Sequence, residues 1–218
     1  MKKTLLFLAL FLIEHPARAT LNCNGLTGVG SHDPKPLYHA SPVQDLKILE
    51  PKVSSHDQKW VYATPYPGIV AAYLGVWSDL DFSQRVDNGE PALVERYAGA
   101  FQSIFSGKSG SIYLVSSEGF LFDQTKFKGE AVKAGTASIY DETNITDALA
   151  YLHELEAQGK VKLYTYPDRP PTVPSDDSDL IEKGVRWVLR KPESDIYSRF
   201  IRFHPGLKER LDQALRQK

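Results

Sequence analysis

Segments with strand-like and helix-like patterns are mixed along this chain without regular alternation, and this arrangement restricts the fold more than any other feature. Regular alternation of strand and helix builds a parallel sheet, whereas an irregular mixture favours the α+β class. The segments predicted as strands are 37–39, 59–65, 111–117, 130–134 and 160–166. The segments predicted as helices are 67–77, 90–105, 144–159, 179–191 and 206–215. The sequence contains no internal repeat, so we expect one α+β domain.

Residue types at the ends of three segments support the predicted helices. Pro67 suits a first helical turn, because that position needs no backbone N–H donor. Asn144 is a suitable N-cap and Gly159 a suitable end for the third helix. Asp179 and Glu182 have the spacing of a capping pair. Within 90–105, the residues at helical spacing are Leu93, Tyr97, Ala100, Phe101 and Ile104.

The first nineteen residues have the three parts of a secretory signal peptide. Lys2 and Lys3 provide the basic start, Thr4 to Ile13 the apolar run, and Ala17 to Ala19 the small-residue cleavage pattern. The apolar run is short for a membrane span, although an uncleaved anchor is the alternative. We therefore expect a periplasmic or secreted protein with no stable membrane span after cleavage.

The rest of the chain begins with an irregular segment that contains the single cysteine. Residues 20–35 are rich in Gly, Asn and Ser and indicate an irregular leader, so the predicted domain is 36–218. Cys23 is the single cysteine, which excludes an internal disulfide. Asn22 stands directly before it, where a bacterial lipoprotein signal needs a small residue. No cluster of Cys and His has zinc-site spacing.

The charge balance argues against general nucleic-acid binding. The whole chain has a formal net charge of −1. Loss of residues 1–19 removes Lys2, Lys3, Arg18 and Glu14. The net charge then falls by 2, from −1 to −3. A nucleic-acid binder needs excess positive charge, so we expect no nucleic-acid partner.

Three common catalytic motifs are not supported by the sequence. The stretch 106–110 (SGKSG) lacks a phosphate-loop glycine at Gln102 and precedes a predicted strand instead of following one. The stretch from His153 (HELEA) has Ala157 where a zinc protease needs its second histidine. The sequence has no G-x-S-x-G elbow, so an α/β-hydrolase serine is not supported.

Three stretches in order carry the functional prediction. They are LYHAS (37–41), VYATPYPGIVAAYL (61–74) and GEAVKAGTASI (129–139). Together they resemble the His–Tyr–Glu branch of the ADP-ribosyltransferase superfamily, which includes the poly-ADP-ribose polymerases and diphtheria-type toxins. The rifampin ADP-ribosyltransferases look similar over more of the chain. The resemblance covers about residues 36 to 140 and implies a split β-sheet with flanking helices and NAD as a substrate.

The resemblance implies a role for each matching residue in binding NAD. His39 would hold a ribose hydroxyl, since a neutral imidazole offers one donor and one acceptor. Tyr62 would stack on nicotinamide, and Tyr73, eleven residues later, would be the second aromatic. The backbone of Ala40 would meet the nicotinamide amide, and Ser41 would add a turn bond. The alternative for these residues is structural: a core histidine and ordinary packed tyrosines.

Glu130 is the predicted catalytic acid. A carboxylate bonded to the ribose hydroxyl strengthens its hold as positive charge develops on the sugar. Glu118, Asp141 and Glu142 are the other acids considered for this position. The alternative for Glu130 is a solvated charge at a strand end.

The sequence departs from the family pattern at two positions. Ala40 replaces the glycine that usually follows the histidine and lets the backbone approach nicotinamide closely. Lys128 stands where arginine-modifying toxins carry Glu or Gln, so arginine is not the expected acceptor. Residues from about 145 onward match no part of the family.

Two functions remain open from the sequence. The first is an exported mono-ADP-ribosyltransferase or NAD glycohydrolase, with a protein or a small molecule as acceptor. The second is a non-catalytic envelope binding protein that keeps the fold. An RNA 2′-phosphotransferase is disfavoured by export and by the net charge. The position of Glu130 relative to His39 distinguishes the two functions. The enzymatic function requires that both side chains face one cleft.

Overall fold

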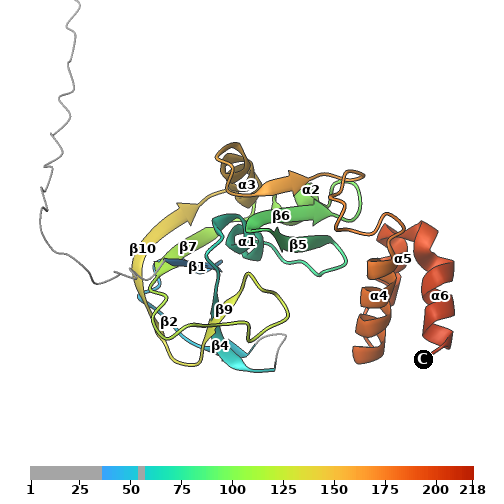
Figure 1. Cartoon of the computed structure of the whole chain (residues 1–218), viewed down its shortest axis with the longest axis horizontal. Coiled ribbons are helices and arrows are strands. Elements are labelled where there is room, and N and C mark those ends of the chain that lie inside the picture. The colour runs from blue at the N-terminus through green and yellow to red at the C-terminus, as the bar shows by residue number, and fades with distance from the viewer. Residues whose placement is uncertain (1–35, 54–56) are drawn as a thin grey trace, which may run out of the picture. The chain divides into compact units, whose positions relative to one another are not determined.

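The computed structural model describes residues 36–53 and 57–218. The predicted signal peptide, the leader at 20–35 and Cys23 lie outside the described residues. The described residues form small antiparallel sheets and several helices, so the predicted α+β class is confirmed (Figure 1).

Two four-stranded antiparallel sheets meet near the predicted site. The first has the order β1 (Leu37–Ser41), β7 (Gly110–Val115), β10 (Ala137–Ile145) and β2 (Ile48–Leu49). The second has the order β3 (Lys52–Val53), β4 (Lys59–Ala63), β9 (Ala131–Lys133) and β8 (Leu121–Phe122). A single bridge joins them, in which Tyr38 and Thr64 exchange backbone hydrogen bonds of 2.8 and 2.9 Å. This bridge places β1 beside β4.

A third sheet is built on a tight hairpin. β5 (Phe82–Asp87) pairs antiparallel with β6 (Glu90–Glu95), and β11 (Lys162–Tyr164) adds parallel to β6. Asn88 and Gly89 connect β5 to β6 with φ values of 53° and 85°. Positive φ at both central residues is the requirement of a type I′ hairpin turn, which Asn-Gly satisfies.

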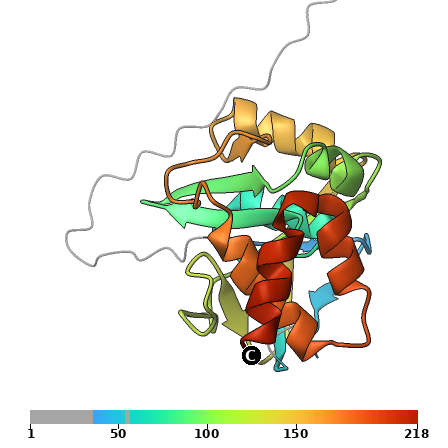
Figure 2. The same cartoon turned by 90° about the vertical axis from the view of Figure 1, so that its right-hand side faces the viewer.

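The helices fall into two sets. Near the sheets lie α1 (Pro67–Ala71), the 3₁₀ turn Ala72–Leu74, α2 (Ala100–Phe105) and α3 (Ala148–Ala157). The C-terminal set is α4 (Ser178–Arg190), α5 (Ile196–Phe203) and α6 (Lys208–Arg216). α4 packs against both α5 and α6, and we call this set, residues 178–216, the helical lobe (Figures 1 and 2).

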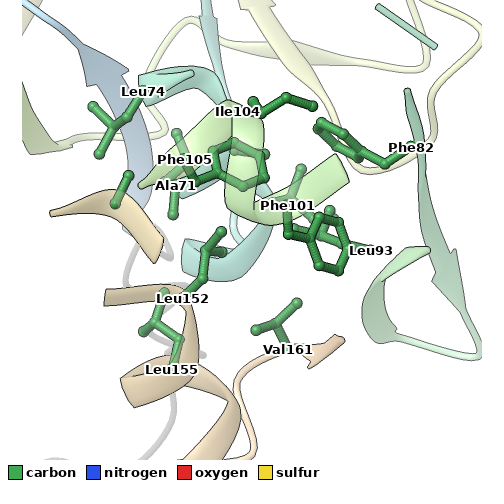
Figure 3. Packing of buried hydrophobic residues seen from close by; sticks show 14 of the residues in the cluster. Ala71, Leu74, Phe82, Leu93, Phe101, Ile104, Phe105, Leu152, Leu155 and Val161 are labelled. Carbon is green, nitrogen blue, oxygen red and sulfur yellow. The ribbon is translucent and has the colours of Figure 1, made fainter. Parts of the chain in front are cut away.

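The main core lies where α1, α2 and α3 meet the β5–β6 hairpin. Phe101 and Phe105 of α2 point toward Phe82 of β5, with ring centroids 5.9 and 5.4 Å away (Figure 3). Leu152 of α3 and Leu93 of β6 are fully buried in the same cluster. A second cluster forms between the first two sheets, and a third joins the helical lobe to Leu80 of the loop before β5. The lobe therefore has its own apolar contacts.

Most predicted segments are confirmed, but the predicted helix 90–105 is wrong. Its first part is strand β6 and only its last part is helix α2. The hairpin turn at Asn88–Gly89 forces residues 90–95 to pair with β5, and Gly99 breaks the chain again with φ of 79°. Tertiary pairing thus overrides the helical spacing of the apolar residues.

Two predicted caps are also wrong. Asn144 lies in β10, where its Oδ1 accepts a 2.8 Å hydrogen bond from Ser111 Oγ, and Asp147 caps α3 through the Ala150 N–H. Asp179 lies in the first turn of α4 and accepts hydrogen bonds from Arg96, so it forms no capping pair with Glu182. Pro67 does occupy the first turn of α1, as predicted.

Candidate functional site

His39 lies on β1 with its ring fixed by β4. Its Nδ1 is 2.7 Å from the carbonyl oxygen of Tyr62. A carbonyl can only accept, so Nδ1 carries the proton and Nε2 is the acceptor of the neutral ring. Burial lowers the pKa of His39 below its ordinary value, although the Tyr62 carbonyl opposes this shift. His39 is therefore neutral at pH 7 and has one nitrogen that can accept from a ligand hydroxyl.

The lowered pKa of His39 predicts a pH dependence of stability. The unfolded chain binds a proton at His39 more readily than the folded chain below pH 6.5, so the free energy of unfolding should rise with pH up to about 6.5. Burial lowers the pKa of His204 too, with the same sign. Denaturant unfolding at several pH values gives the free energy of unfolding as a function of pH. Below pH 6.5 this free energy should rise less steeply with pH in His39→Gln than in the wild type. Parallel curves would contradict the assigned shift.

Glu130 reaches the same region through strand pairing. It directly precedes β9, and its N–H donates to the Phe127 carbonyl in a 3.0 Å turn bond. Ala131 pairs with Ala63 of β4, so Glu130 stands near Thr64, which in turn bridges to β1. His39 on β1, Tyr62 on β4 and Glu130 directly before β9 therefore lie near one another.

A cleft of about 1000 Å³ contains the predicted residues. Its lining includes His39, Ala40, Tyr62, Tyr73 and Glu130. These residues come from separate stretches of the chain, and the geometry meets the condition that Glu130 and His39 face one cleft. The cleft is at the upper end of the range of ligand pockets, about 300–1000 Å³.

The other predicted residues lie elsewhere. Ser41 makes the predicted turn bond, with its Oγ accepting from the Val43 N–H at 3.1 Å, but it does not line the cleft. Glu118 and Asp141 do not line it either. Glu142 accepts a hydrogen bond from the Asp45 N–H. Among the acids considered from the sequence, Glu130 is therefore the one in the cleft.

Tyr73 links the cleft to the β5 strand. Its hydroxyl donates to Gln84 Oε1 at 3.1 Å, while 41% of the residue remains exposed. Surrounding protein atoms and the nearby Glu130 carboxylate raise the pKa of Tyr73, and Tyr62 adds to the effect. Tyr62, Tyr73 and Glu130 are therefore close enough to influence one another electrostatically.

Most of the cleft lining was not predicted from the sequence. The remaining lining comes mainly from the loop 75–81 and from the helical lobe, including Trp77, Asp79, Trp187, Lys191 and Arg199. No local motif marks these residues, because the loop and the lobe are about a hundred residues apart in the sequence. The segment after residue 145, which matched no family part, thus forms a wall of the site.

No protein-family model, curated protein or solved structure matches this chain. Within residues 36–53 and 57–218, no group of three or more His, Cys, Asp or Glu side chains is placed to hold a metal ion. The same residues include no helix with the length and apolar character to cross a bilayer.

Proposed function

We propose that the cleft binds NAD and cleaves its nicotinamide–ribose bond, which would make the protein an exported mono-ADP-ribosyltransferase or NAD glycohydrolase. The observation that carries the proposal is that His39 on β1, Tyr62 on β4 and Glu130 in the turn before β9 line one cleft. The proposed family relationship and its split-sheet fold rest on the order of these residues and on the single bridge between β1 and β4.

Each residue has a chemical task in this proposal. Tyr62 and Tyr73 provide aromatic faces for nicotinamide, and His39 Nε2 accepts a hydrogen bond from a ribose hydroxyl. Glu130 accepts from the other ribose hydroxyl. As the bond from C1′ to the nicotinamide nitrogen breaks, the bonding pair leaves with nicotinamide and positive charge develops on the ribose.

The Glu130 carboxylate stabilises this charge most strongly in the transition state, because the ribose is then most positive. Water or an acceptor hydroxyl then attacks C1′ and loses its proton. Attack by water gives free ADP-ribose, and attack by an acceptor gives a transferred group.

A second candidate function is NAD binding without cleavage in the cell envelope. Ala40 supports it, because this residue lines the cleft where the resembling family has glycine. A methyl group at this position reduces the room for the nicotinamide amide. The ligand would still contact the same residues, so binding alone does not separate the two candidates.

Titration calorimetry with NAD tests the part that both candidates share. Tyr62→Ala should weaken binding roughly tenfold, since loss of one stacked aromatic costs about 1–3 kcal/mol. Tyr140→Ala is the matched control, because Tyr140 is 69% exposed and lies outside the cleft. Equal affinities of the two variants would contradict the proposed placement of nicotinamide.

A further inference from the structure

We propose that the part of the cleft formed by the loop 75–81 and the helical lobe binds an aromatic group that carries a negative charge. This inference goes beyond the proposed reaction, because it concerns a wall that contributes nothing to the His39–Glu130 set. Two kinds of molecule supply such a group: the adenylate half of NAD, or a separate aromatic acid that serves as acceptor.

Three aromatic rings line this part of the cleft, and each is held by a different contact. The Trp187 indole N–H donates to Asp79 Oδ1 at 2.6 Å. Trp77 packs on Phe82 with centroids 4.3 Å apart, and Phe203 stacks on Tyr97 at 4.3 Å and 15°. Rings held in this way offer flat apolar surfaces at little cost in conformational entropy.

The apolar side chain of Val76, next to Trp77 in the sequence, is exposed to solvent. Val76 is 92% exposed and also lines the cleft. Water covers it in the free protein, and a flat apolar ligand would displace that water. The wall therefore favours an aromatic group over a purely polar one.

Two acids of this wall, the half-buried Asp79 and the buried Asp81, already have partners within the protein. Asp79 accepts from Trp187 at Oδ1 and from Arg186 at Oδ2. Asp81 accepts from Ser78 at Oδ2 and from Tyr97 at Oδ1, and Arg199 lies 3.3 Å from Oδ2. The negative charges of Asp79 and Asp81 are therefore compensated by protein groups, so they oppose an anionic ligand less than unpaired carboxylates would.

Lys191 supplies the charge for a ligand. It lines the cleft at the end of α4, and its Nζ lies 5.6 Å from the centroid of the Trp187 ring. Among residues 36–53 and 57–218, no carboxylate makes an ion pair with it. Asp195 also lines the cleft, so its removal should strengthen anion binding. An ammonium beside an indole suits a ligand that is both aromatic and anionic.

Fluorescence titration with two probes tests this site without any need for turnover. One probe is 8-anilinonaphthalene-1-sulfonate, an aromatic anion, and the other is the neutral N-phenyl-1-naphthylamine. Lys191→Gln should weaken binding of the anion about five- to tenfold at low salt and leave the neutral probe within about twofold. Asp195→Asn should strengthen binding of the anion.

Lys162→Gln is the matched control, because Lys162 also lies over an aromatic ring, Tyr164, at 4.7 Å but outside the cleft. Absence of anion binding in the wild type would overturn the proposal. Equal loss in Lys191→Gln and Lys162→Gln, or equal loss of both probes in Lys191→Gln, would also overturn it.

Addition of ADP-ribose then identifies the source of the aromatic anion. Displacement of the sulfonate by ADP-ribose would assign the wall to the adenylate half of the dinucleotide. Simultaneous binding would assign it to a separate aromatic acid. Because neither result requires cleavage of NAD, failure of the proposed reaction and failure of this site remain distinguishable.

Discussion

Glu130→Gln should lower the rate of nicotinamide release at saturating NAD by at least about 100-fold, because removal of one group that stabilises transition-state charge has an effect of this size. Glutamine keeps the shape of the side chain and removes the negative charge. The charge matters most when the ribose is positive, so NAD affinity should change by less than about threefold. Single-turnover kinetics and calorimetry on the same preparation separate the two quantities.

Glu118→Gln is the control for this substitution. Glu118 is exposed and lies outside the cleft, although the sequence alone made it an alternative acid. Its rate should stay within about twofold of the wild type, since surface substitutions remote from the reacting atoms have small effects. A large loss in Glu118→Gln with little loss in Glu130→Gln would reverse the assignment.

Arg96→Met should lower the free energy of unfolding by about 3 kcal/mol, the cost of breaking a buried ion pair from one side. The Arg96 side chain is 0% exposed and donates to Asp179 at 2.5 and 2.8 Å and to Asp177 at 2.9 Å. Burial raises the pKa of Asp179, but the Arg96 guanidinium outweighs this effect and lowers it overall. Asp179 would lose its two short hydrogen bonds to Arg96, while Asp177 would keep its 2.6 Å bond from Arg169.

This contact joins the end of β6 to the start of the helical lobe, so its loss should also loosen one wall of the cleft. Arg85→Met is the matched control. Arg85 pairs with Asp87 at 3.0 Å near the surface, and such a pair contributes less than about 1 kcal/mol. Urea unfolding of both variants measures the difference, and equal stabilities would show that Arg96 does not hold the lobe.

Strands with a clear alternation or apolar run were predictable from the sequence. Residues 59–65 and 111–117 became β4 and β7, because each is short, β-branched or aromatic, and bounded by turn residues. The hairpin of β5 and β6 was missed although Asn88–Gly89 is a strong turn signal. The apolar spacing of 93, 97, 100 and 104 concealed a boundary between strand and helix.

The candidate site was predictable from the sequence where it consists of ordered motif residues. It was not predictable where it depends on contacts between residues far apart in the chain. His39, Tyr62 and Glu130 are each ordinary in isolation. Their order in the chain was the basis for proposing a shared role, and the structure places all three in the lining of one cleft. Arg96 and Asp179 are separated by 83 residues, and no local pattern relates them. The loop 75–81 and the helical lobe therefore entered the site only through the tertiary structure.

Nicotinamide release from NAD by the wild-type protein, followed by chromatography, tests the central claim most directly. We predict nicotinamide that accumulates linearly with time and with protein concentration, and that falls to the background level in Glu130→Gln. NAD that binds but remains intact through prolonged incubation would contradict cleavage and leave the binding function. NAD that neither binds nor reacts would contradict both, and His39 would then be a histidine that serves the fold alone.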